Sequence, residues 1–267
     1  MEHCHVLKFV NSGAMPEFIV RQIGNFESIK TIKFDGIVSF KVMPGRFCIG
    51  NLMRNNSHKY CFNKVSSGYQ CNDCFKQNPY NFCAFCSGTK CYLGDKICGE
   101  HFVYLATFAN VLKVGVTSIR RWPERVVEQG ADFASVIAQT PDGLEARRIE
   151  SEIKKRFNIT DKMYNKYKSR LLHRKDAREL GKHILQAAYA DIVDTMPVTT
   201  KLDLDILDLS ENYTDFEEQP NVKEIIDDVQ ICGKVIGTKG NFIVMKNGAQ
   251  TEVFNGYDLV GRVIKIE

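Results

Sequence analysis

Four cysteines give the strongest indication of a chemical site in this sequence, because their spacing is typical of a metal-binding site. Cys71 and Cys74 form one C-x2-C pair, and Cys83 and Cys86 form a second pair after eight intervening residues. Each pair places two thiolates on one tight turn, and two such turns complete the tetrahedral sulfur site of a structural zinc ion. An iron–sulfur cluster also takes four cysteines, but this spacing favours zinc. Because four protein ligands leave no open position on the metal, the site predicts a stabilised fold and not a reaction.

Other cysteines leave room for a second metal site. Cys61, Cys91 and Cys98 flank the four-cysteine group, and they could be completed by Cys48, His58 or His101. The spacings are irregular, so the alternative is that these residues are buried free thiols, which pack as small apolar side chains.

Length and composition indicate an ordinary globular protein of two or three small domains. The chain has 267 residues, of which 44% are hydrophobic and 25% charged. No apolar run reaches the roughly 18 residues of a membrane span, and the first residues do not have the pattern of a signal peptide. Cysteines clustered in pairs favour metal binding in a reducing compartment. We therefore expect a cytoplasmic protein without a membrane partner.

Charge is unevenly distributed along the chain. Residues 143–182 hold 13 Lys and Arg against 6 Asp and Glu, a net charge of +7. Residues 202–228 hold 10 Asp and Glu against one Lys, a net charge of −9. The two segments could be solvated faces that attract each other, or a nucleic-acid-binding surface beside an acidic linker. In the second interpretation Arg170, Arg174 and Arg178 would contact phosphates.

The sequence predicts an α+β protein with five parts. Residues 1–60 form an N-terminal β region, since residues 32–42 alternate and Pro44-Gly45 follows them. Residues 61–100 form the cysteine-rich zinc module, residues 101–196 an α/β core with basic helices, and residues 197–228 the acidic linker. Residues 229–267 form a small C-terminal β-barrel or meander, in which Asn247-Gly248 marks a hairpin.

Within the α/β core, a regular order of elements is expected. Residues 102–108 and 112–117 read as strands around a turn at Ala109-Asn110, residues 120–129 as a helix, and residues 136–138 as a third strand. Pro123 fits only near the start of its helix. A second helix runs from Asp142, a suitable N-cap, to about Arg156, and two basic helices fill residues 161–194.

Several residues of this core follow one another in a familiar order: Val103-Tyr104-Leu105-Ala106, Lys113-Val114-Gly115, Arg125 and Glu150. In this order the core resembles the GIY-YIG nuclease superfamily. The resemblance implies that Tyr104 and Gly115 occupy the two strand motifs, that Arg125 contacts phosphate, and that Glu150 binds Mg²⁺ or Mn²⁺. Lys113 stands where the second motif has a tyrosine, and Arg121 competes with Arg125 for the arginine position.

The same residues have plain structural explanations. Tyr104 could be a core aromatic residue whose hydroxyl finds a backbone partner, and Lys113 a solvated strand residue. Gly115 could allow close approach of the backbone. Arg125 and Glu150 could form an ion pair between helices.

A second resemblance covers most of the chain. Its residues are Arg46-Phe47-Cys48-Ile49-Gly50, the cysteine cluster, Lys113-Val114-Gly115-Val116, Glu128-Gln129-Gly130-Ala131 and a late Gly-Thr-Lys-Gly-Asn segment at 237–241. In this order the chain is similar to an uncharacterised archaeal and bacterial domain-of-unknown-function family. The resemblance implies that the parts act together, and it implies no activity.

Three functions follow as hypotheses. The first is a zinc-containing protein that binds RNA or DNA through a GIY-YIG-like domain without turnover. The second is a metal-dependent endonuclease that uses Tyr104, Lys113, Arg125 and Glu150, with Mg²⁺ or Mn²⁺ at the glutamate. The third is a protein–protein adaptor that uses the acidic stretch and the C-terminal β domain. The geometry of the four core residues discriminates between the first two hypotheses.

Overall fold

A computed structural model describes residues 2–11, 15–24, 28–52, 58–78, 81, 83, 86, 88–91, 98–174, 176–196, 204–214, 216 and 218–267. The chain divides into two compact units. One comprises Met1–Asn81 together with Pro220–Glu267, and the other comprises Phe82–Gln219. The second unit is therefore inserted into the sequence of the first. We describe each unit by itself.

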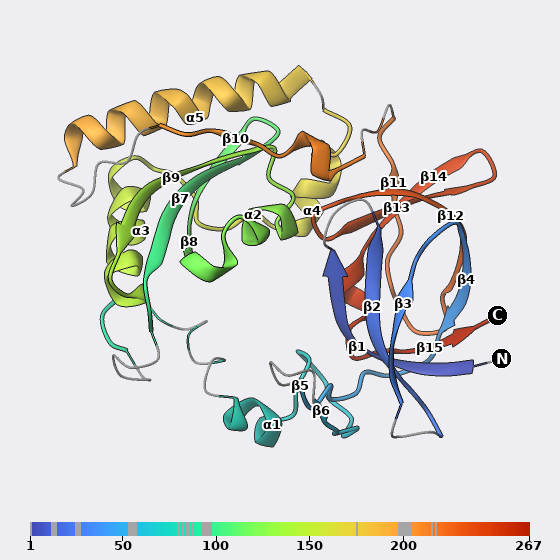
Figure 1. The fold of residues 1–267 in the computed structure, drawn as a ribbon. Helices are drawn as coiled ribbons and strands as arrows, with labels where there is room; N and C mark the ends of the chain where they lie inside the picture. The colour runs from blue at the N-terminus through green and yellow to red at the C-terminus, as the bar shows by residue number, and fades with distance from the viewer. Residues whose placement is uncertain are drawn as a thin grey trace. The chain divides into compact units, whose positions relative to one another are not determined.

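The first unit is built on one sheet of nine strands (Figure 1). Its strand order is β11-β14-β13-β12-β4-β15-β1-β2-β3. All neighbouring strands are antiparallel except β11 and β14, which are parallel. The strand bounds are β1 Glu2–Asn11, β2 Pro16–Gln22, β3 Ile29–Lys33, β4 Ile37–Val42, β11 Asn221–Val222, β12 Gln230–Lys239, β13 Phe242–Asn247, β14 Gln250–Asn255 and β15 Val263–Ile266.

The N-terminal and C-terminal strands belong to this same sheet, whereas we expected two separate β regions. Strand β4 pairs with β12 on one edge and with β15 on the other. The alternation of apolar and polar residues at 32–42 predicted strands, but it did not predict which other strands they pair with. A single core of buried side chains, including Phe18, Phe40 and Phe254, joins strands from both ends of the chain.

Local turn chemistry matches the sequence. Asn247 pairs with Gln250 across the hairpin of β13 and β14, and Gly248 has φ of 59°. That left-handed conformation suits glycine and explains the Asn-Gly signal. Between β4 and the second unit, the chain adds three short elements to the first unit: β5 Asn51–Leu52, β6 His58–Lys59 and α1 Asn72–Gln77.

The second unit has a four-stranded antiparallel sheet in the order β10-β9-β7-β8. The strands are β7 His101–Phe108, β8 Val111–Ser118, β9 Phe133–Thr140 and β10 Leu207–Asp208, and the helices are α2 Glu124–Glu128, α3 Gly143–Arg156, α4 Asn165–Lys168 and α5 Asp176–Thr195. Pro123 occupies the N-cap of α2, and Asp142 caps α3 by accepting the amide of Glu145 at 2.8 Å. Both helix starts agree with the sequence signals.

The two faces of this sheet have separate cores. On one face, side chains of α3 and α5, such as Ile153 and Leu185, pack on Val103 and Leu105 of β7. On the other face, Tyr104 and Ala106 pack against α2 and the segment around Leu209, and Val126 of α2 is fully buried there. Because neighbouring residues of a strand point to opposite faces, Tyr104 lies on the α2 side of β7.

Among the residues described, the acidic stretch up to residue 219 belongs to the second unit and residues 220–228 belong to the first, whereas we expected a linker. Strand β10 pairs with β9, and Asp208 forms an ion pair with Arg178 of α5. Further along, Asp227 of the first unit pairs with Arg262. Ion pairs and a short edge strand therefore hold the stretch against the folded chain. The carboxylates of Asp208 and Asp227 are already paired with arginines of this protein.

Among the described residues, no helix is both long and apolar enough to cross a membrane.

Candidate functional site

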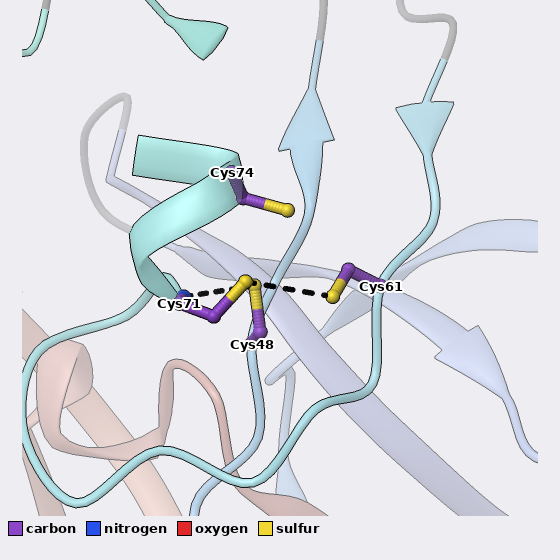
Figure 2. A group of neighbouring side chains, drawn as sticks. All are labelled: Cys48, Cys61, Cys71 and Cys74. Atoms are coloured by element: carbon purple, nitrogen blue, oxygen red, sulfur yellow. Dashed lines mark hydrogen bonds between the residues drawn. The ribbon is translucent and has the colours of Figure 1, made fainter. Parts of the chain in front are cut away.

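Four cysteines of the first unit gather at one point. The sulfur atoms of Cys48, Cys61, Cys71 and Cys74 all lie within 4.8 Å of one another (Figure 2). Cys48 and Cys74 are buried, and Cys61 and Cys71 are half-buried. Four convergent thiols, two of them shielded from water, could hold a metal ion such as zinc.

Backbone amides support this arrangement. The Sγ of Cys48 accepts the amide of Cys71 at 3.2 Å and the amide of Gly50 at 3.4 Å (the first is dashed in Figure 2). Cys71 is the N-cap residue of α1, and the backbone amide of Cys74 lowers the pKa of the Cys71 thiol to about 7. Such N–H···S hydrogen bonds stabilise the thiolate form that binds a metal.

Gly50 makes the turn after Cys48 possible. Its φ is 64°, and a β-carbon there would lie 2.1 Å from the carbonyl oxygen of Lys59. Only glycine fits this close approach without moving the backbone of β6, which leads to Cys61. The Cys48-Ile49-Gly50 sequence is the signal that could have pointed to Cys48 as a ligand.

The structure divides the cysteine set that we expected. Cys71 and Cys74 lie together, but Cys48 and Cys61 join them in place of Cys83 and Cys86, which belong to the second unit. Among the described residues, this is the one group of Cys, His, Asp or Glu side chains with three or more ligand atoms so close together. The long gaps of 12 residues after Cys48 and 9 residues after Cys61 concealed the pairing.

The second unit contains a cluster of polar residues on the α2 side of its sheet. The Oε1 of Gln129 accepts hydrogen bonds from Tyr104 Oη at 3.0 Å and from Lys113 Nζ at 2.9 Å. Gly115 lies opposite Tyr104 in the β7–β8 register, and a β-carbon at Gly115 would come within 2.5 Å of the tyrosine ring. Gly115 therefore leaves space for Tyr104 to reach Gln129.

Arg125 and Glu150 interact electrostatically with this cluster. Burial, followed by the charge of Arg125, lowers the pKa of Lys113 to about 8, while Glu150 acts in the opposite direction. Burial also raises the pKa of Tyr104 to about 12. The four predicted residues are therefore near enough to one another for their charges to act together.

Arg125 and Glu150 do not pair with each other, which was one of the plain explanations. Arg125 pairs with Glu128 at 3.4 Å, and Glu128 also binds Arg121 at 2.5 Å. Glu150 pairs with Arg147 on the same helix at 2.7 Å, and its side chain is only 10% exposed. Among the described side chains, no carboxylate lies within ion-pair distance of Lys113.

A basic hollow lies on the outer side of α3. It has a volume of about 740 Å³ and is lined by Gly88, Thr89, Arg148, Ser151, Glu152, Lys155 and Arg156. Three of the lining side chains are cationic and one is anionic. Lys155 and Arg156 are exposed, so both can meet an anionic ligand.

The three arginines expected to contact phosphates differ in their surroundings. Arg178 is 20% exposed, pairs with Asp132 and Asp208, and stacks over Phe133. Arg174 pairs with Asp176 at 3.3 Å, and Arg170 is exposed. Arg178 therefore has a structural role in joining α5 to β9 and β10, which charge counting along the sequence does not reveal.

The protein therefore consists of two units. The β unit contains a four-cysteine candidate metal centre, and the α/β unit is inserted into its sequence. Residues 37–263 match the family model described as protein of unknown function DUF2797, and the chain belongs to this family. No curated protein and no solved structure matches the chain.

We expect Cys48→Ser and Cys61→Ser each to lower the zinc content of the purified protein by one equivalent, because a tetrahedral site loses its closed ligand set. Loss of the metal should also lower the free energy of unfolding of the first unit, since metal binding and folding are coupled. Elemental analysis and thermal unfolding measure both effects. The exposed Cys232 on β12 provides the control Cys232→Ser, which should retain all its metal. Unchanged zinc in both Cys48 and Cys61 variants would exclude them as ligands.

Proposed function

We propose that this chain is a zinc-containing nucleic-acid-binding protein whose second unit is GIY-YIG-like and contacts the phosphates of RNA or DNA. The observation behind the proposal is the position of Lys113. Its ammonium group is half-buried beside Arg125 and donates to the neutral amide of Gln129. A phosphate there would supply the missing negative charge and restore the lysine's usual pKa.

The neighbouring charges favour the same ligand. Arg125 and Arg121 share Glu128, and Arg147 is bound to Glu150, so two carboxylates serve three arginines before Lys113 is counted. With Lys113 included, four positive charges face two negative charges, so the net charge of this group is positive. A polyanion is the ligand that such a positive charge attracts, and its affinity falls with salt because counterions are released on binding.

The order of elements also supports a GIY-YIG-like unit. The central antiparallel strands β8, β7 and β9 bear Tyr104 and Gly115, α2 bears Arg125, and α3 bears Glu150. This is the arrangement that the resemblance in the sequence implies. The hollow along α3, with Lys155 and Arg156 exposed, offers a second place for the nucleic-acid backbone.

Reversing the charges of Lys155 and Arg156 to Glu should weaken binding to all RNA and DNA sequences alike, and should reduce the salt slope by about one unit per lost phosphate contact. Titration of single- and double-stranded RNA and DNA at several salt concentrations measures both. Lys234→Glu with Lys246→Glu is a control of equal charge change on exposed residues of the first unit. If both double variants lose the same affinity, the loss comes from the change in net charge alone. That result would contradict the hollow as a binding surface.

Binding should also depend on pH through Lys113. Its pKa of about 8 means that the ammonium charge of the free protein is lost as pH rises from about 7 to 9, so affinity should fall with rising pH. Because a bound phosphate raises this pKa, the fall in affinity begins near pH 8 and continues up to the pKa of the bound state.

Lys113→Arg keeps its charge at every accessible pH and should remove most of the pH dependence. Lys168→Arg is the matched control, because Lys168 is also buried but donates to the backbone oxygen of Gln129. A pH profile that is the same in wild type and Lys113→Arg would remove Lys113 from the binding site.

Metal-dependent cleavage of phosphodiesters is a second candidate function. It is favoured by the buried carboxylate of Glu150, whose charge acts on both Tyr104 and Lys113, because a buried carboxylate beside a phosphate site can hold Mg²⁺ or Mn²⁺. In that role Arg147, which pairs with Glu150, would have to release it to the metal. Tyr104 and Lys113 would orient the attacking water, and Arg125 would stabilise charge on the phosphate.

If this activity exists, Glu150→Gln should abolish cleavage with Mg²⁺ or Mn²⁺ while retaining binding, because the amide keeps the shape of the side chain and loses its charge. Arg125→Ala should lower the rate about 10²–10³-fold, the scale expected for one preorganised donor. A cleavage assay on structured RNAs and branched DNAs measures both. Glu179→Gln, which changes an exposed carboxylate on α5, should be as active as wild type. Binding without cleavage by wild type would favour the non-catalytic protein.

A further inference from the structure

We propose a second metal centre, formed by Cys83, Cys86, Cys91 and Cys98 of the second unit and suited to zinc. The first unit already completes its own set of four sulfur ligands without these residues. The unit boundary lies between Cys74 and Cys83, so each unit contains one set of four cysteines. The proposal does not depend on nucleic-acid binding.

The spacing of the second set fits a compact metal-binding loop. It reads C-x2-C-x4-C-x6-C, and all four ligands lie within 16 residues. The C-x2-C pair supplies two thiolates from one turn, and the amide of Cys86 donates to the carbonyl oxygen of Cys83 at 3.2 Å to close that turn. A pair of this kind usually needs two more ligands nearby, and Cys91 and Cys98 are the next cysteines along the chain.

Cys98 is hydrogen-bonded at the start of α3. Its Sγ accepts the amide of Gly143, the first residue of α3, at 3.0 Å. The helix start places partial positive charge at this sulfur, while burial and the charge of Asp142 act in the opposite direction and raise the pKa of Cys98. A β-carbon at Gly143 would lie 2.7 Å from the same sulfur, so the glycine is required for this contact.

Gly88, which lies between Cys86 and Cys91, is packed on the same helix. The carbonyl oxygen of Gly88 accepts a hydrogen bond from Arg148 Nε at 2.8 Å. A β-carbon at Gly88 would come within 2.9 Å of the backbone nitrogen of Arg148. Gly88 and Cys98 are therefore both hydrogen-bonded to α3, at Arg148 and at Gly143 respectively.

The four thiols also act on one another electrostatically. Burial raises the pKa of Cys83, and the charges of Cys98, Cys91 and Cys86 raise it further. No three of their sulfur atoms lie within 4.8 Å of one another, unlike those of the first set, so binding of one metal requires the four side chains to move together. Each thiol would release its proton to solvent on binding, and the dication would replace mutual repulsion by attraction.

The remaining two of the ten cysteines do not compete for this role. Cys4 is fully buried in the core of the first unit, and Cys232 is exposed on β12. His101 is the residue that could substitute for a cysteine. Its ring lies beside Gly143 as Cys98 does, and its Nδ1 is hydrogen-bonded to the carbonyl oxygen of Gly99 at 2.6 Å, so its Nε2 is the atom that could bind a metal.

The test is the metal content of the full-length protein, purified under reducing conditions. Wild type should contain two equivalents of zinc. Cys83→Ser and Cys91→Ser should each contain one, Cys61→Ser should contain one, and the control Cys232→Ser should contain two. One equivalent in wild type would overturn the proposal. Two equivalents in Cys91→Ser together with one in His101→Ala would overturn the assignment of Cys91.

Cobalt substitution keeps the test decisive if a variant folds poorly. Wild type titrated with Co²⁺ should show sulfur-to-cobalt charge-transfer and tetrahedral d–d bands that grow to two equivalents. Cys61→Ser, in which only the second set is intact, should still bind one Co²⁺ with a four-sulfur spectrum. X-ray absorption of the zinc protein should give about four sulfur neighbours per metal at about 2.3 Å. Saturation of wild type at one Co²⁺, or fewer than four sulfurs around the metal in Cys61→Ser, would contradict the second site.

Discussion

Strand β4 is hydrogen-bonded along both edges, to β12 on one side and to β15 on the other, and the first unit depends on this pairing. The chain leaves β4 at Val42, and the candidate metal loop begins six residues later at Cys48. The amide of Phe47 donates to the carbonyl oxygen of Gly261 at 2.7 Å, and Arg46 Nη1 donates to the carbonyl oxygen of Val260 at 2.7 Å. The turn before β15 therefore positions the first cysteine ligand, although more than 200 residues separate them along the chain.

Helix α3 has a comparable role in the second unit. Its first amide contacts Cys98, its buried residue Glu150 acts electrostatically on Lys113, and its exposed side lines the basic hollow with Lys155 and Arg156. One helix thus contributes residues to the proposed phosphate-binding site around Lys113, to the hollow and to the proposed second metal loop. A shift of its start by one residue would turn all three sets of side chains by about 100°, so the Asp142 cap is important for every one of them.

The features that sequence predicted well are those set by neighbouring residues. The strand pair at Tyr104 and Gly115, the cap at Asp142 and the hairpin at Asn247-Gly248 all follow from periodicity or turn chemistry over a few positions. The α/β core also has the predicted order of strands and helices, whereas the roles of Lys113 and Glu150 stay predictions.

Pairings between distant segments could not be obtained in this way. Alternation identifies β4 as a strand but contains no information on whether β12, β15 or neither lies beside it. The cysteines show the same limit, because two C-x2-C pairs close in sequence appeared to form one site while the unit boundary separates them. Arg178 and Asp208 were assigned to opposite charge blocks, and their ion pair became evident only from the fold.

The insertion of one unit into the other has a consequence for synthesis on the ribosome, where a chain emerges from its N-terminal side. The second unit is complete once residue 219 has emerged, so it can fold while the first unit still lacks β12 to β15. During that interval β4 has two unpaired edges, which are the kind of surface that associates with other chains. The cysteines from 48 to 74 have by then also emerged. Early uptake of a metal by this loop would order the segment that follows β4 before the remaining strands arrive.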